Sequence, residues 1–93
     1  MTDAAHLVLA HGFTQTGASW QPTVEHLRDR RPDVGVTAVD LPGHGTAGDV
    51  RADLWDSADH LVDRGGAGVY VGYSMGGRVA LHAALAQPTA VRA

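Results

Sequence analysis

The fold is decided by the stretch Val69-Tyr70-Val71-Gly72-Tyr73-Ser74-Met75-Gly76-Gly77, which leads into the Ala- and Leu-rich residues 79–86. The three apolar residues at its start predict a short buried strand, and residues 79–86 predict a helix that ends before Pro88. Between them lies the pattern G-x-S-x-G, typical of a sharp turn that holds a serine in a strained backbone conformation. The sequence therefore predicts a strand, a tight turn presenting Ser74, and a helix.

The rest of the chain continues this alternation of strands and helices. Residues 7–10 form a continuous apolar run and residues 34–40 are rich in β-branched side chains, so both predict strands. Apolar residues recur at helical spacing in the two segments between the strands: Trp20, Val24 and Leu27 in the first, and Val50, Leu54, Ala58 and Leu61 in the second. The order β-α-β-α-β-α predicts an α/β fold, with parallel strands and helices on both faces of the sheet.

Composition excludes several classes of function. The 93 residues are 44% hydrophobic and 18% charged, with a net charge of -3 and scattered arginines, which argues against a nucleic-acid or membrane partner. The absence of cysteine fits a reducing compartment, so we expect a cytoplasmic protein. The acidic N-terminus and the short apolar run after it predict no signal peptide or membrane anchor.

The spacing of ligand-type residues predicts neither a metal nor a cofactor. No pair of histidines has the i, i+4 spacing of a helical zinc site, and H-E-x-x-H does not occur. The glycine-rich turn at 72–77 lacks the lysine of a phosphate-binding loop and departs from G-x-G-x-x-G. We therefore expect chemistry carried by side chains and backbone groups alone.

The chemistry predicted at the turn is nucleophilic catalysis. Ser74 is the candidate nucleophile, and the helix that follows offers free N–H groups, of which that of Met75 is nearest. A second donor is expected from the loop after the first strand, where the backbone N–H of Phe13 follows His11-Gly12. Two peptide donors beside a serine would form an oxyanion hole.

Three motifs, His11-Gly12-Phe13, the run 40–45 (Asp-Leu-Pro-Gly-His-Gly) and 72–77 (Gly-Tyr-Ser-Met-Gly-Gly), together resemble the α/β-hydrolase superfamily. The resemblance spans the whole chain but only about the first third of a typical member, so residues 1–93 are expected to be a partial α/β-hydrolase domain. It implies a small-molecule substrate with a carbonyl or carboxylate group, and a triad of Ser74 with a later acid and a later histidine.

Residues 11–17 and 72–78 also resemble, more narrowly, a menaquinone-pathway lyase, 2-succinyl-6-hydroxy-2,4-cyclohexadiene-1-carboxylate synthase, which eliminates pyruvate instead of hydrolysing an ester. That resemblance implies that Arg78 binds a substrate carboxylate, although a solvated helix arginine is the alternative. Tyr73 either lines the substrate pocket or packs structurally. Ester hydrolase and lyase both remain open.

The base of the triad is not evident within the sequence. The one histidine after Ser74 is His82, roughly 12 Å along the same helix by helical rise, which is too far to accept its proton. His11 is expected to shape the oxyanion loop by hydrogen bonding, and His44 to make a structural hydrogen bond in its turn. The acid and the base are thus expected beyond residue 93. A non-catalytic α/β binding module is the alternative from another class.

Overall fold

The central strand of the sheet is β1 (His6–Ala10), which pairs in parallel with β2 (Gly35–Val39) on one side and β3 (Val69–Gly72) on the other. The structure is a computed structural model, and it describes residues 5–93. The register places Ala10 opposite both Val39 and Gly72, so all three strands end at the same edge of the sheet. The parallel sheet predicted from the sequence is confirmed.

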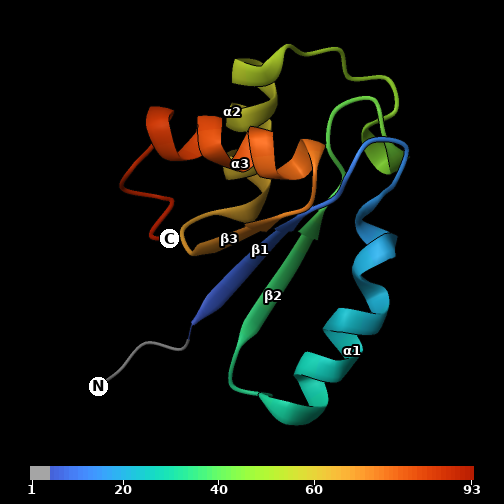
Figure 1. Cartoon of the computed structure of the whole chain (residues 1–93), viewed down its shortest axis with the longest axis vertical. Coiled ribbons are helices and arrows are strands. Elements are labelled where there is room, and N and C mark those ends of the chain that lie inside the picture. Colours follow the sequence, from blue (N-terminus) through green and yellow to red (C-terminus); the bar gives the residue numbers. More distant parts are fainter. Residues whose placement is uncertain (1–4) are drawn as a thin grey trace.

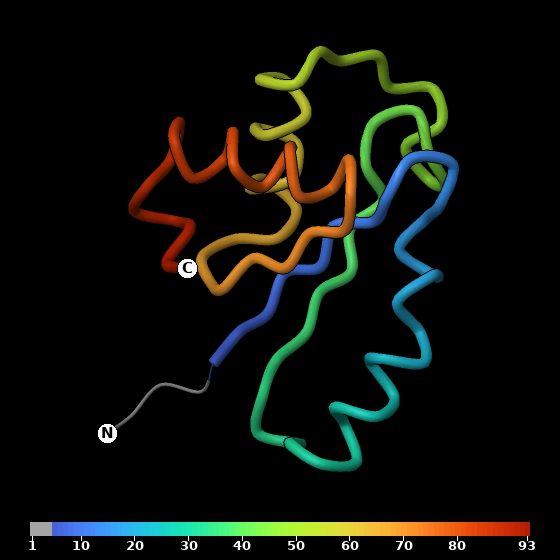
Figure 2. The backbone as a smooth tube through the Cα atoms, viewed as in Figure 1, coloured from blue at the N-terminus to red at the C-terminus, as the bar shows by residue number. Residues whose placement is uncertain are grey.

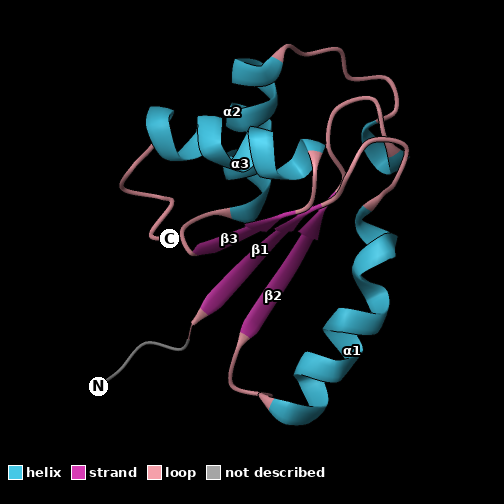
Figure 3. Cartoon of the chain, in the orientation of Figure 1, coloured by secondary structure: helices cyan, strands magenta, loops and turns pink. Residues whose placement is uncertain are grey.

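Helices cover both faces of this sheet (Figures 1 and 3). One face carries α1 (Gln21–Arg30), and the other carries α2 (Leu54–Gly65) and α3 (Met75–Ala86), which pack against each other. Two short 3₁₀ helices, η1 (Gly17–Trp20) and η2 (Gly45–Ala47), lie in the loops that follow β1 and β2. The β-α-β-α-β-α order is therefore the observed one.

The main core lies between the sheet and the α2–α3 pair. Side chains alternate along β1, so that Val8 and Ala10 belong to this core, while buried Leu9 lies outside it. The core is completed from the other strands and helices by Val39, Leu41, Ala58, Leu61, Val62, Tyr70, Val79 and Ala83. This packing fixes α3, and with it the turn at Ser74, against the sheet.

Two details of the predicted helices are wrong. Val50 was expected on the apolar face of the second helix, but α2 begins four residues later, because the Asp53 carboxylate accepts a hydrogen bond from the Asp56 N–H at 2.8 Å and caps the helix there. Trp20 lies in η1 and not in α1, which starts at Gln21 with proline in its first turn. Neither difference moves a strand end.

Candidate active site

The turn between β3 and α3 holds Ser74 in an unusual backbone conformation. Its φ is 54° and its ψ is -114°, and Thr14 is the other non-glycine residue with positive φ within residues 5–93. Such a conformation persists only where the surroundings impose it. Ser74 is the N-cap of α3, yet its hydroxyl makes no capping hydrogen bond and the residue is exposed. The hydroxyl is therefore available to another molecule.

Close backbone contacts impose this turn. A Cβ added to Gly76 would lie 2.1 Å from the carbonyl oxygen of Ala10, and one added to Gly72 would lie 2.5 Å from the backbone of Gly76. Both distances are far below any real contact, so the two glycines of G-x-S-x-G are required by space alone. Ser74 lies between these two close backbone contacts and remains exposed to solvent.

The loop after β1 lies beside this turn, as the tube in Figure 2 shows. The Tyr73 N–H donates to the Ala10 carbonyl at 3.0 Å, and the Tyr73 ring covers Gly12, where a Cβ would lie 2.9 Å from Cδ2. Parallel strands ending at one edge thus bring residues 11–16 against residues 73–77. The two segments that the sequence predicted to form one site are neighbours.

Some backbone N–H groups in these segments are unengaged, among them those of Phe13, Ser74 and Met75. Neither the Phe13 N–H nor the Met75 N–H donates to any group within residues 5–93. The Gly76, Gly77 and Arg78 N–H groups, by contrast, all donate to the carbonyls of Tyr73 or Ser74. The free donors include the two that the sequence singled out, and an unengaged peptide N–H is what an oxyanion hole requires.

His11 is fully buried, and both its ring nitrogens are engaged. Nε2 accepts from the Leu41 N–H at 3.0 Å, so the proton must lie on Nδ1, which donates to the Gly12 carbonyl at 2.8 Å. Burial lowers the pKa of His11 below its usual 6.5, and the bond to the Gly12 carbonyl opposes this shift only in part. His11 is thus a neutral structural group that joins the loops after β1 and β2.

His44 and Asp40 extend this network; the sequence placed Asp40 in the motif 40–45 but assigned it no role of its own. The Asp40 carboxylate accepts from the Gly17 N–H at 2.6 Å and from the Thr46 N–H and hydroxyl at 2.9 and 2.8 Å. These bonds, that of the Thr46 N–H first, hold the pKa of Asp40 below its ordinary value. The structural hydrogen bond expected of His44 is present, since its Nδ1 donates to the Pro42 carbonyl at 3.0 Å.

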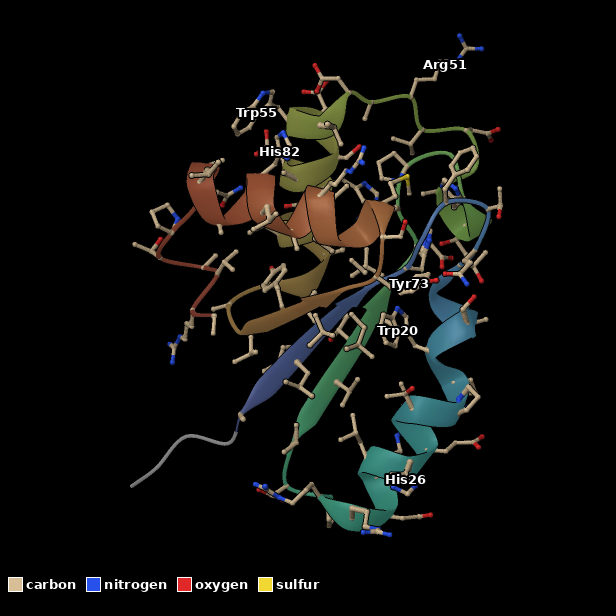
Figure 4. The ribbon with its side chains drawn as sticks, viewed as in Figure 1. Trp20, His26, Arg51, Trp55, Tyr73 and His82 are labelled. Atoms are coloured by element: carbon tan, nitrogen blue, oxygen red, sulfur yellow. The ribbon has the colours of Figure 1, made fainter. Side chains whose placement is uncertain are left out.

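Arg78 and Tyr73 both lie on the exposed side of the turn. Arg78 is one helical turn after Ser74 and makes no ion pair within residues 5–93, so its guanidinium is free to meet an anion. Tyr73 is 61% exposed and lies with Trp20 at a small hollow of about 230 Å³ (Figure 4). The packing of Tyr73 on Gly12 and its exposure are compatible with either role considered for it.

Two other histidines have structural partners. His82 lies against Trp55 with ring centroids 4.5 Å apart, and its Nδ1 donates to the Arg78 carbonyl at 2.7 Å, so it faces α2 (Figure 4). His60 is half-buried, and its Nε2 donates to the Asp40 carbonyl at 3.0 Å. Neither of these histidines is therefore free to act as the base of Ser74.

A broad hollow of about 880 Å³ opens beside the turn, between α3, the loop after β1 and the segment before α2. Its lining is largely apolar and includes Phe13, Leu41, Val50, Leu54, Met75 and Val79. Ser74 is not part of this lining, but the residue after it is. Within residues 5–93, no cluster of three or more metal-ligating side chains occurs and no helix has the length and apolarity to cross a bilayer.

The fold and the turn define a class of protein, and sequence comparison agrees: residues 7–93 match the alpha/beta hydrolase family, and the chain belongs to it. Among its relatives is the pimeloyl-[acyl-carrier protein] methyl ester esterase of Vibrio campbellii, 45% identical over an alignment of 87 residues that covers 91% of this chain and 33% of that enzyme. The putative 2-succinyl-6-hydroxy-2,4-cyclohexadiene-1-carboxylate synthase of Haemophilus influenzae is 37% identical, over 86% of this chain and 34% of its own.

A solved structure supports the fold. An extracellular α/β-hydrolase from a Paenibacillus species, described as homologous in structure and function to tobacco salicylic acid binding protein 2, superposes with a TM-score of 0.70 at 21% identity. The match covers 94% of this chain and 37% of that protein. This chain thus spans about a third of the length of the relatives it matches.

Proposed function

We propose that this chain supplies the nucleophile and the oxyanion hole of a serine-dependent ester hydrolase. The observation that carries the proposal is the strained, exposed Ser74 beside two unengaged peptide donors, those of Phe13 and Met75. The Ser74 hydroxyl would attack the ester carbonyl, the two N–H groups would stabilise the oxyanion, and the alcohol would leave before water releases the acid. The relatives named as methyl ester esterases support this substrate class.

The general base and its acid must come from outside residues 5–93 in this mechanism. His11 has both ring nitrogens engaged, His44 likewise, and His82 faces Trp55. The resemblance to the family implies that a later acid and a later histidine complete the triad. Activity is therefore a property to be measured on the full-length gene product.

The proposal is tested by Ser74→Ala in the full-length gene product, with a short-chain methyl or 4-nitrophenyl ester as substrate. Loss of the nucleophile should lower kcat by about 10⁴-fold or more while the thermal midpoint stays unchanged. Ser19→Ala is the matched control, because it removes the same hydroxyl from η1 and should leave kcat unaltered. Turnover that survives in Ser74→Ala at the wild-type rate would remove this serine from the mechanism.

A second candidate function is the lyase reaction, in which the same site would abstract a proton and the oxyanion hole would stabilise an enolate as pyruvate leaves. The free Arg78 guanidinium and the Haemophilus influenzae relative favour it, with Tyr73 lining the pocket beside a carboxylate held by Arg78. Methanol released from a methyl ester supports the esterase, whereas pyruvate released together with formation of 2-succinyl-6-hydroxy-2,4-cyclohexadiene-1-carboxylate supports the lyase. In either case we propose a small-molecule substrate and a cytoplasmic setting.

A further inference from the structure

We propose that His44 is a positioning residue, which holds the loop after β1 so that the Phe13 N–H remains free and points to the oxyanion. The inference rests on the proposed function, because it gives that N–H a catalytic task. His44 comes from the loop after β2 and is thirty positions further along the chain than the residue it binds. It does not contact the substrate in this proposal, but acts through the loop.

Both nitrogens of the His44 ring are used, and this fixes the orientation of the ring. The Nδ1–H donates to the Pro42 carbonyl at 3.0 Å, which leaves Nε2 as an acceptor, and Nε2 accepts from the Thr14 N–H at 3.1 Å. Thr14 has a φ of 67°, a left-handed conformation that a β-branched residue adopts only under constraint. The hydrogen bond that the Thr14 N–H donates to His44 directly constrains this conformation.

The peptide groups on either side of the Phe13 N–H are held, and the N–H itself is not. The Gly12 N–H donates to Oε1 of Gln15 at 2.9 Å, and the Thr14 N–H donates to His44. The Phe13 ring also meets the His44 ring edge-on, with centroids 5.7 Å apart. Rotation of the loop that would turn the Phe13 N–H away must therefore break a bond to His44 or to Gln15.

The experiment compares His44→Gln with His44→Asn in the full-length gene product. The Gln side chain reaches the position of Nε2 and offers an oxygen to the Thr14 N–H, whereas Asn keeps a donor for the Pro42 carbonyl but ends too early to reach Thr14. We expect His44→Asn to lower kcat on an ester about 10²-fold with KM little changed, as loss of an oxyanion donor does. His44→Gln should recover most of this loss.

Amide hydrogen exchange of Thr14, followed by NMR, supplies a readout that does not depend on catalysis. The Thr14 amide should be protected in the wild type and in His44→Gln, and should exchange rapidly in His44→Asn. His26→Asn is the control, since His26 is exposed on α1, far from the turn (Figure 4), and should change neither quantity. If His44→Asn does not fold, His44→Phe keeps the ring and still removes the acceptor.

The outcomes separate the two proposals. Three results would each overturn the positioning role. The first is equal kcat in His44→Asn and the wild type, and the second is an equal loss of kcat in the Asn and Gln variants. The third is Thr14 amide protection that stays the same when His44 is substituted. A wild type with no Ser74-dependent turnover would overturn the proposed function and the oxyanion task with it, while dependence of Thr14 exchange on His44 would still report the bond itself.

Discussion

The two segments that meet at the candidate site are built in opposite ways. The turn at 73–77 is shaped by missing side chains, because its glycines let backbone approach backbone, and its serine hydroxyl caps nothing. The loop after β1 is held by side-chain hydrogen bonds. Its own His11 accepts from the Leu41 N–H, while Asp40 and His44, which follow β2, accept from the Gly17 and Thr14 N–H groups. One segment depends on space and the other on hydrogen-bond acceptors.

This difference predicts which substitutions should destabilise each segment. Added atoms should break the turn, whereas the loop should tolerate added bulk at exposed positions and fail when an acceptor is removed. The stability of the loop should also depend on pH, through His11 and through Asp40, which binds Gly17, whereas that of the turn should not. The three predictions that follow test this contrast.

The largest effect is expected from Gly76→Ala. The new methyl group would lie 2.1 Å from the Ala10 carbonyl oxygen, so α3 must move off β1, at a cost of about 3 kcal/mol or more in the free energy of unfolding. Gly77→Ala is the matched control, because its methyl group would lie 3.4 Å from the nearest atom and should instead stabilise the helix by about 0.5 kcal/mol. Urea denaturation measures both, and similar values for the two would contradict the steric explanation.

An intermediate effect is expected from His11→Leu, which leaves the buried Leu41 N–H without an acceptor and should cost about 2 kcal/mol at pH 7. Because burial lowers the pKa of His11, the unfolded chain binds a proton there before the folded chain does. The wild type therefore loses stability as the pH falls from about 6.5 through the folded pKa, and the variant does not. Denaturation curves should show a smaller difference in the free energy of unfolding between wild type and variant at pH 5 than at pH 7. An equal difference at both pH values would count against this role.

The smallest effect is expected from Asp40→Asn, at about 1 kcal/mol near neutral pH, because an amide accepts weaker hydrogen bonds from Gly17 and Thr46 than a carboxylate does. The folded pKa of Asp40 is lowered, so its contribution is present above its ordinary value near 3.8 and is lost as the pH falls through the folded pKa. Thermal melts from pH 7 to pH 2.5 should converge for wild type and variant. Asp33→Asn is the control: Asp33 forms an exposed ion pair with Arg31, so this substitution should change the free energy of unfolding less than Asp40→Asn does.

The sequence predicted the parts of this molecule that depend on local pattern. Apolar runs and helical spacing predicted the order of strands and helices. The pattern G-x-S-x-G predicted the turn, because the geometry of this turn depends on its own glycines and serine. The start of α2 was wrong because the Asp53 cap outweighed the apolar spacing that includes Val50. Periodicity alone carries no information about capping.

The side-chain network could not be predicted in the same way. Asp40 reaches Gly17 and His44 reaches Thr14 across separations that only the paired strands make short. Asp40 ends the apolar run of the second strand, which in hindsight is a signal, because a carboxylate at the carboxyl edge of a parallel sheet is exposed to the loops there. His60 gave no such signal, and its bond to the Asp40 carbonyl depends on how α2 packs on β2.

The register of β1 also has a consequence for biogenesis. Leu7 pairs with Val36 on one side and with Val69 on the other, so the strand synthesised first is the one that must wait for both partners. A nascent chain can join β1 to β2 early, but the edge of β1 that receives β3 stays open until the serine turn has been made. A ribosome-bound chain shorter than this should therefore expose an unpaired backbone edge that invites chaperones or misassembly, and its closure should coincide with the first appearance of the site.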